Sequence, residues 1–184
     1  MRKIREEELI RLAEEVGFAA AAAVDTGDIV FQPSFRPLCA ENVCGKYGVN
    51  YACPPDCGTV EEMADRVRRY RRGLVLQTMW DIEDPMDEAA TKPAKRRHNR
   101  MTREFIKRAG VLGLMVGAGG CDLCPECAIV RGEPCRFPGE MFSCMSAYCI
   151  FMKKLCESCG MDYDCGPGVV AFFSMLCFDP EEEA

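Results

Sequence analysis

The sequence that decides the fold runs Gly117-Ala118-Gly119-Gly120-Cys121-Asp122-Leu123-Cys124-Pro125-Glu126-Cys127, and Cys135 follows eight residues later. The apolar run at residues 111–116 stands directly before it and predicts a buried strand that leads into the cysteines. Three thiolates at two-residue spacing can converge on one centre, and a fourth from further along completes a common ligand set of iron–sulfur clusters. We therefore expect Cys121, Cys124, Cys127 and Cys135 to bind a metal centre.

The spacing of this run differs from that of a bacterial ferredoxin. Seven residues separate Cys127 from Cys135, whereas the ferredoxin run has three in its last gap. The glycines before Cys121 permit a close approach of the backbone, whose N–H groups could hydrogen-bond the cluster sulfurs. A phosphate-binding loop is disfavoured, because more cysteines follow the glycines where such a loop would open a helix. Zinc is the alternative metal, although no pair of CxxC motifs is present.

A second group of cysteines lies in the Gly- and Pro-rich residues 36–58. Because Pro and Gly interrupt helices and strands, this segment is predicted to be a loop. It has few apolar side chains with which to order itself, and metal binding would supply the missing folding energy. We expect a second iron–sulfur centre here, with structural zinc, or a site that uses only some of these thiols, as the alternatives. The four candidate ligands are Cys39, Cys44, Cys53 and Cys57.

The composition indicates the cellular compartment of the protein and the kind of partner it binds. The 184-residue chain has fourteen cysteines, and its first residues, 1–8, contain no apolar signal segment. We therefore expect a reducing, cytoplasmic setting, where clustered cysteines bind metal or do redox work. The longest apolar runs fall short of the ~20 residues of a membrane helix. A net charge of −6 argues against nucleic acid and suits a partner protein with a basic docking face, unless it serves only solubility.

The six remaining cysteines are predicted to have different roles. Cys149, Cys156 and Cys159 fall on the apolar stripe of a helix that Ser143 is predicted to cap, and Cys177 falls in an apolar strand, so all four are expected in the core. The roles of two others stay open, and a third metal centre formed by three of the six is a further hypothesis. The open residues are Cys144 and Cys165, and the third centre would use Cys156, Cys159 and Cys165.

Helices and strands are expected to alternate along the chain. Helices are predicted at residues 4–16, after Thr59, at 95–109 and after Ser143, and strands at 74–80, 111–116 and 169–178. A hairpin is predicted between residues 18–24 and 29–31, and a loop at 81–94. No internal linker is evident, so we expect a single domain over residues 1–184. The fold class is predicted to be an α/β sandwich that carries two cysteine-rich metal-binding loops, 36–58 and 117–138, with α+β as the alternative.

The single histidine, His98, lies among charged residues at 95–100 and is expected to be a solvated surface residue. With one histidine in the chain, a His-rich zinc site and a Ser-His-Asp or Cys-His catalytic dyad are disfavoured. The basic residues at 92–108 are predicted to form a solvated helix face, with docking of an acidic partner or an anionic ligand as the alternative.

These motifs together resemble a family of cysteine-rich microbial proteins of unknown function that are labelled only as predicted metal-binding proteins. The resemblance is carried by Cys39…Cys44-Gly45-Lys46-Tyr47-Gly48 with Cys53-Pro54-Pro55, by the CxxCxxC run from Cys121, and by Pro134-Cys135-Arg136-Phe137-Pro138. It extends through residues 143–148 to Phe172-Phe173-Ser174. It implies metal binding, at these two cysteine groups, in anaerobic microbes, and it implies no particular activity. The chain departs from the family pattern at Cys149, where glycine is expected.

Three functional hypotheses follow. In the first, two [4Fe-4S] clusters, one on each loop, pass single electrons to a partner oxidoreductase. No acid–base pair, nucleophile dyad or nucleotide loop stands out, so an electron carrier or accessory protein is favoured over a catalyst. The second hypothesis is a cluster-dependent enzyme, or a factor that activates another metalloenzyme. The third is a zinc-stabilised structural or interaction protein.

Overall fold

Two long strands form the centre of the molecule in the computed structural model, which describes residues 4–181. Strand β2 (Arg72–Asp81) pairs antiparallel with β4 (Val169–Phe178) over ten residues, from Arg72 opposite Phe178 to Asp81 opposite Val169. Both strands were expected from their apolar runs, and the burial of β4 on its two faces confirms its prediction as a doubly covered strand.

Shorter strands flank this pair. Strand β1 (Ala20–Asp25) pairs with β2, and β3 (Leu114–Val116) pairs with β4, so the sheet order is β1-β2-β4-β3 with every pairing antiparallel. The predicted hairpin between residues 18–24 and 29–31 is wrong, because β1 pairs with the distant β2 and Phe31 forms an isolated bridge to Ile150. The alanines of β1 do not indicate whether this strand pairs with residues 29–31 or with β2.

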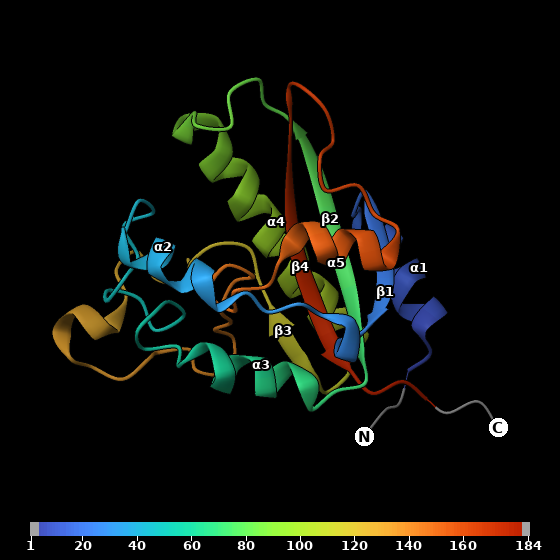
Figure 1. Ribbon diagram of the computed structural model, residues 1–184, viewed down its shortest axis with the longest axis horizontal. Coiled ribbons are helices and arrows are strands. Elements are labelled where there is room, and N and C mark those ends of the chain that lie inside the picture. Colours follow the sequence, from blue (N-terminus) through green and yellow to red (C-terminus); the bar gives the residue numbers. More distant parts are fainter. Residues whose placement is uncertain (1–3, 182–184) are drawn as a thin grey trace.

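Alternate residues of the central strands pack into two separate cores. Leu74 and Leu76 of β2 face the core beneath α1 (Glu6–Val16) and α4 (Glu88–Ala109), whereas Val75 faces the other side. On that side lie α3 (Val60–Arg68) and α5 (Met152–Cys159). Figure 1 shows α5 crossing one face of the sheet, with α4 behind it. Burial of these apolar side chains on both faces stabilises the layered arrangement.

The described residues thus form a mixed α+β fold of five α-helices and one open antiparallel sheet, which is the stated alternative to the expected α/β class. The alternation of helices and strands was predicted, but all strands that neighbour each other in the sheet are antiparallel, whereas alternation with helices favours parallel neighbours. Short 3₁₀ turns at Thr26–Asp28, Pro33–Phe35 and Ala128–Arg131 and the short helix α2 (Arg36–Ala40) complete the elements. No helix within residues 4–181 is long and apolar enough to cross a membrane.

Helix ends agree with the sequence in most places. Gly17 ends α1 in the left-handed conformation at φ 100°, which glycine adopts without strain. Thr59 starts α3 with a capping box, in which its hydroxyl accepts from Glu62 N and the Glu62 carboxylate accepts from Thr59 N. Helix α4 is longer than expected, because Asp87 caps it and residues 88–94 extend the helix through Pro93. Part of the predicted 81–94 loop is therefore helical.

The last helix begins later than expected. Helix α5 starts at Met152, and residues 143–150 form successive turns instead of the helix that Ser143 was predicted to cap. These turns are held to the end of β3, since Gly117 N donates to Ser143 O at 2.8 Å and Met145 N donates to Gly117 O at 3.1 Å. Cys149 has a positive φ of 55°, which is outside the helical range. Pairing with β3 therefore competes successfully with helix formation here.

Candidate metal centres

The two cysteine-rich loops lie side by side beyond one edge of the sheet (Figure 1). The first cysteine loop, residues 36–58, contains α2 and the turns after it, and the second, residues 117–138, contains the turn at Ala128–Arg131. Two hydrogen bonds join them. Asn50 Nδ2 donates to Cys121 O at 2.9 Å, and Tyr51 Oη donates to Glu133 O at 2.8 Å. The loops therefore form one unit, although they are distant in sequence.

Backbone hydrogen bonds give the first loop its shape. Cys53 N donates to Asn50 O at 2.9 Å, Cys57 N donates to Cys53 O at 3.1 Å, and the Pro54–Pro55 peptide bond is cis. Gly48 N donates to Pro54 O at 2.9 Å and closes the loop across its middle. The chain thus turns repeatedly with few buried apolar side chains, as its Gly and Pro content predicts.

Three of the four thiols predicted in the first loop surround one cavity of about 420 Å³, which we call the first cavity. They are Cys39, Cys44 and Cys53. Two further cysteines line the same cavity, Cys121 of the second loop and Cys144 of the turns after that loop. Cys57 does not line this cavity. Its sulfur lies 3.6 Å from Arg36 Nη1, which donates to it, and 3.5 Å from Met63 Sδ.

Cys144 is the functional candidate that the sequence left open. Its neighbours bond to Gly117 at the end of β3, and its side chain is 8% exposed. No spacing rule connects Cys144 with Cys39, because tertiary structure brings them together across more than one hundred residues. The one available signal was its position just after the motif Pro134–Pro138.

All four thiols predicted in the second loop line a second cavity, of about 20 Å³. They are Cys121, Cys124, Cys127 and Cys135, and Asn50 and Tyr51 of the first loop complete part of its wall. Cys121 lines the first cavity as well, so it stands between the two sites. A volume of this size accepts a single ion or water. An iron–sulfur cluster would require the walls to move outward.

The donor chemistry fits a metal centre in each cavity, and the thiols do not yet stand at ligand positions. Across residues 4–181, no three Cys, His, Asp or Glu side chains are already arranged to hold one metal ion. Thiolate ligands select iron–sulfur clusters, zinc and other soft metals. Closure onto a metal therefore needs rearrangement of the cysteine side chains, within loops whose order would in turn come from the metal.

Backbone and charge around the first cavity suit a thiolate-bound group. A Cβ added at Gly120 would lie 3.2 Å from Cys53 Sγ, so this glycine lets the backbone approach a sulfur of the other loop. The first cavity is also lined by four cations, and Asp122 is the one carboxylate among its described walls. Arg103 already pairs with Asp122 at 3.0 Å. The four cations are Lys46, Lys92, Lys95 and Arg96.

Burial keeps several of these thiols protonated in the absence of metal. It raises the pKa of Cys53 to about 12, and it raises the pKa of Cys39, Cys121 and Cys144 above the ordinary thiol value. Only thiolates ligate metals well, so metal binding at either cavity must release protons.

The other cysteines lie away from both cavities. Cys149, Cys156 and Cys177 are at most 1% exposed, which confirms their predicted place in the core, although Cys149 is not part of the last helix. Cys159, which was also predicted in the core, packs against it but is only half-buried, and Cys165 is half-buried as well. Gln77 Nε2 donates to Cys165 Sγ at 3.4 Å and to a backbone oxygen at 2.9 Å, and so fixes that loop to the sheet.

The prediction for His98 is wrong, because the side chain is fully buried in α4. Its Nδ1 shares a hydrogen bond of 2.9 Å with Thr78 Oγ1, and no described atom bonds Nε2. Burial lowers the pKa of His98 to about 4. The charged residues around His98 in the sequence occupy the other faces of the helix.

Comparison with known proteins gives one family. A family model described as "Predicted metal-binding protein (DUF2284)" matches residues 22–178, a range that runs from within β1 to the end of β4 and includes both cysteine loops. The match confirms the resemblance drawn from the motifs. No curated protein and no solved structure matches the chain.

Proposed function

This chain belongs to the DUF2284 family of predicted metal-binding proteins, and on that premise we propose that it is an iron–sulfur protein that carries two [4Fe-4S] clusters, one at each cysteine loop. The observation that supports the proposal is the gathering of cysteines around two adjoining cavities. Residues from distant parts of the chain supply thiols to the first, and the CxxCxxC run with Cys135 supplies them to the second. A ligand set of four thiolates is the usual one for such clusters.

We propose that the protein passes single electrons to a partner oxidoreductase. Cys121 lines both cavities, so two clusters held there would be neighbours and electrons could move between them. The exposed Cys44 lies at the outer side of the first site and gives a partner a route to it. The cations around the first cavity would offset the negative charge of a thiolate-bound cluster and would favour its reduced form.

The test is metal and sulfide analysis of protein purified without oxygen, together with its visible and spin-resonance spectra. We expect iron and sulfide in equal amounts. Cys124→Ser should remove one centre and Cys44→Ser the other, while Cys165→Ser, in a loop outside both cavities, should retain the iron of the wild-type protein. Equal loss of all iron from the first two variants would indicate one shared site.

Zinc is the second candidate, favoured by the small volume of the second cavity. About 20 Å³ has room for one ion without outward movement of the walls, so only the cysteine side chains would have to turn toward it, and four thiolates are a usual structural zinc set. A colourless protein with zinc and no sulfide would contradict the iron–sulfur proposal. Iron in one site and zinc in the other would support an iron–sulfur cluster at the iron-containing site alone.

A further inference from the structure

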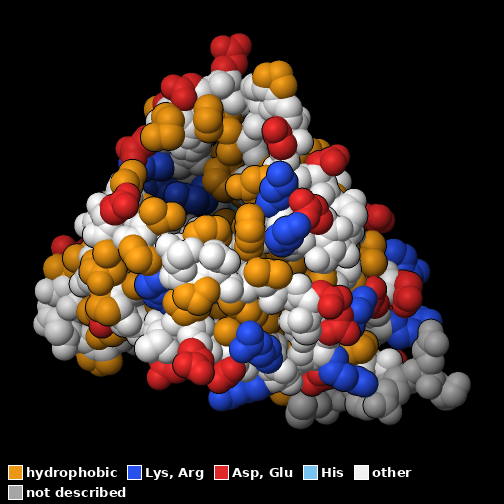
Figure 2. Space-filling view, viewed as in Figure 1, with side chains coloured by type: hydrophobic (Ala, Val, Ile, Leu, Met, Phe, Trp, Pro, Cys, Tyr) orange, Lys and Arg blue, Asp and Glu red, His pale blue; other side chains and the backbone are white. Residues whose placement is uncertain are grey.

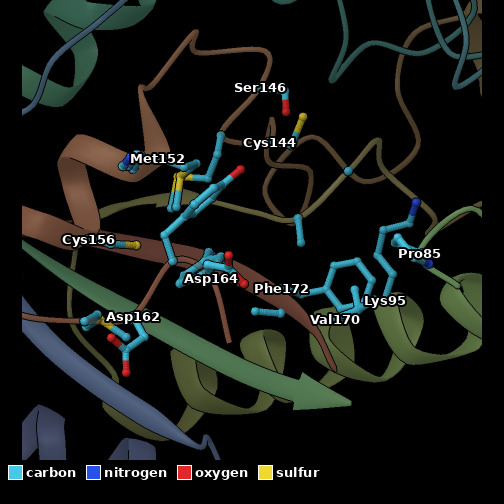
Figure 3. A pocket seen from close by; sticks show the side chains of 18 of the residues that line it. Pro85, Lys95, Cys144, Ser146, Met152, Cys156, Asp162, Asp164, Val170 and Phe172 are labelled. Carbon is cyan, nitrogen blue, oxygen red and sulfur yellow. The ribbon is translucent and has the colours of Figure 1, made fainter. Parts of the chain in front are cut away.

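A large cleft adjoins the first cavity. Its volume is about 900 Å³, and it lies over the first residues of β4 (169–173), between α5 and the turns that carry Cys144 (Figure 3). In Figure 2 a hollow on this face holds Lys and Arg side chains in its depth and hydrophobic side chains around them. The residues that line both the cleft and the first cavity are Lys95, Gly119, Cys144 and Ser146. A molecule in the cleft would therefore touch the wall of the cysteine site.

Lys95 stands at this junction, and it interacts electrostatically with the exposed Glu88 carboxylate two turns earlier in α4. No ion pair among the described residues includes Lys95. The stem of Lys95 packs against Gly119, since a Cβ on that glycine, whose φ is +71°, would lie 2.9 Å from Lys95 Cδ. Figure 3 shows Lys95 extending from α4 beside Phe172. An ammonium group that lines a concave site and makes no direct ion pair there is suited to an anion.

The rest of the cleft is apolar on one wall and has a net negative charge elsewhere, because Glu157, Asp162 and Asp164 line it with Lys153 as the other cation. Val170 and Phe172 of β4 and Met152 of α5 provide the apolar wall. Asp162 lies at the opposite end of the view from Lys95 (Figure 3). An anionic group is therefore attracted to the junction and repelled from the far end, while apolar surface covers the body of the ligand.

We propose that this cleft binds a small organic acid, with its carboxylate on Lys95 and its apolar body against Val170 and Phe172. The carboxylate end of the ligand then lies beside Cys144, next to the first metal centre. The site is defined by Lys95 and the apolar wall, so binding goes beyond the proposed electron carrier and does not require the metal. It adds a small-molecule ligand to a protein whose other proposed partner is a protein.

The test uses 4-fluorobenzoate as the probe and follows its fluorine NMR signal with the protein purified without oxygen. We expect saturable binding of 4-fluorobenzoate and at least tenfold weaker binding of the neutral 4-fluorobenzamide. Lys95→Met should weaken 4-fluorobenzoate at least tenfold, and Lys95→Arg should retain most of the affinity. The matched control is Lys107→Met, which removes a lysine of the same helix outside the cleft and should leave binding unchanged.

A second variant tests the apolar wall. Val170→Phe, which fills the cleft, should weaken the acid and the amide alike. The proposal is overturned if 4-fluorobenzoate does not bind the wild-type protein, if Lys95→Met binds it as tightly as wild type, or if the amide binds equally well. Iron is measured on the same samples. If the purified protein holds no iron but binds 4-fluorobenzoate through Lys95, the organic-acid site is supported and the iron–sulfur proposal is contradicted. If it holds iron but does not bind 4-fluorobenzoate, the iron–sulfur proposal is supported and the organic-acid site is contradicted.

Discussion

Acidification should destabilise the fold through His98, and the structure gives the magnitude. The imidazole is fully buried between two aromatic rings, with centroids 5.7 Å from that of Phe18 and 6.3 Å from that of Phe172. Thr78 occupies Nδ1, and a proton added to the ring would leave an N–H at Nε2 without an acceptor among the described residues. Burial thus disfavours the charged form and lowers the pKa from 6.5 to about 4.

The effect on stability follows from that interval. Because the folded pKa lies below the unfolded one, the contribution is fully present above pH 6.5 and is lost as the pH falls through 4. At about 1.4 kcal/mol per pH unit, the interval corresponds to about 3 kcal/mol. This is a large part of the stability of a domain of ordinary size.

The assay uses the fact that His98 is the only histidine. The carbon-bound ring protons give one set of NMR signals, whose shift with pH reports the pKa directly in the native protein. We expect no titration between pH 8 and 5.5, and a free energy of urea unfolding that falls below pH 6.5. His98→Gln should lose this part of the pH dependence. An imidazole that titrates near 6.5 in the folded protein would refute the reasoning.

Three further predictions concern the loops and a helix end. Cys144→Ala should remove roughly four irons per chain. Cys57→Ala should keep them, because the Cys57 thiol lies outside the first cavity. Iron loss in Cys57→Ala and not in Cys144→Ala would make Cys57, and not Cys144, the ligand of the first centre. Gly120→Ala places a methyl group 3.2 Å from the Cys53 sulfur and should weaken metal retention about tenfold, measured by chelator competition, with the unfolding midpoint nearly unchanged. Thr59→Ala removes the capping box and should lower the free energy of urea unfolding by about 1 kcal/mol. Unchanged retention or stability would contradict the last two.

Apolar runs and stripes in the sequence predicted the helices and strands that bury one continuous apolar face. The apolar run of β4 and the inward stripe of α4 were expected, and Met101, Phe105, Ile106 and Ala109 do contribute to the core beneath α1. The burial of His98 was missed, because the charges beside it in sequence outweighed its spacing. His98 stands seven residues before Phe105 and eleven before Ala109, on the same helix face.

Long-range pairing accounts for two further errors and for the placement of Cys144. The alanines of β1 fit several partners, and only the assembled sheet selects β2. The turns at 143–150 look helical in their spacing, and the hydrogen bonds to Gly117 decide against the helix. The same bonds bring Cys144 to the first cavity, a placement that no ligand-spacing rule contains. The second cysteine run was recognisable because all its candidate ligands are near neighbours in sequence.

The two hydrogen bonds between the loops have a consequence for the order of metal loading. Asn50 and Tyr51 can reach Cys121 and Glu133 only when both loops are in place, so whatever orders one loop lowers the entropy cost of ordering the other. By thermodynamic linkage, each metal then raises the affinity for the second by the same factor, whichever enters first. Half-loaded molecules should then be less abundant than two independent sites would give, and loading should occur over a narrower range of free metal concentration.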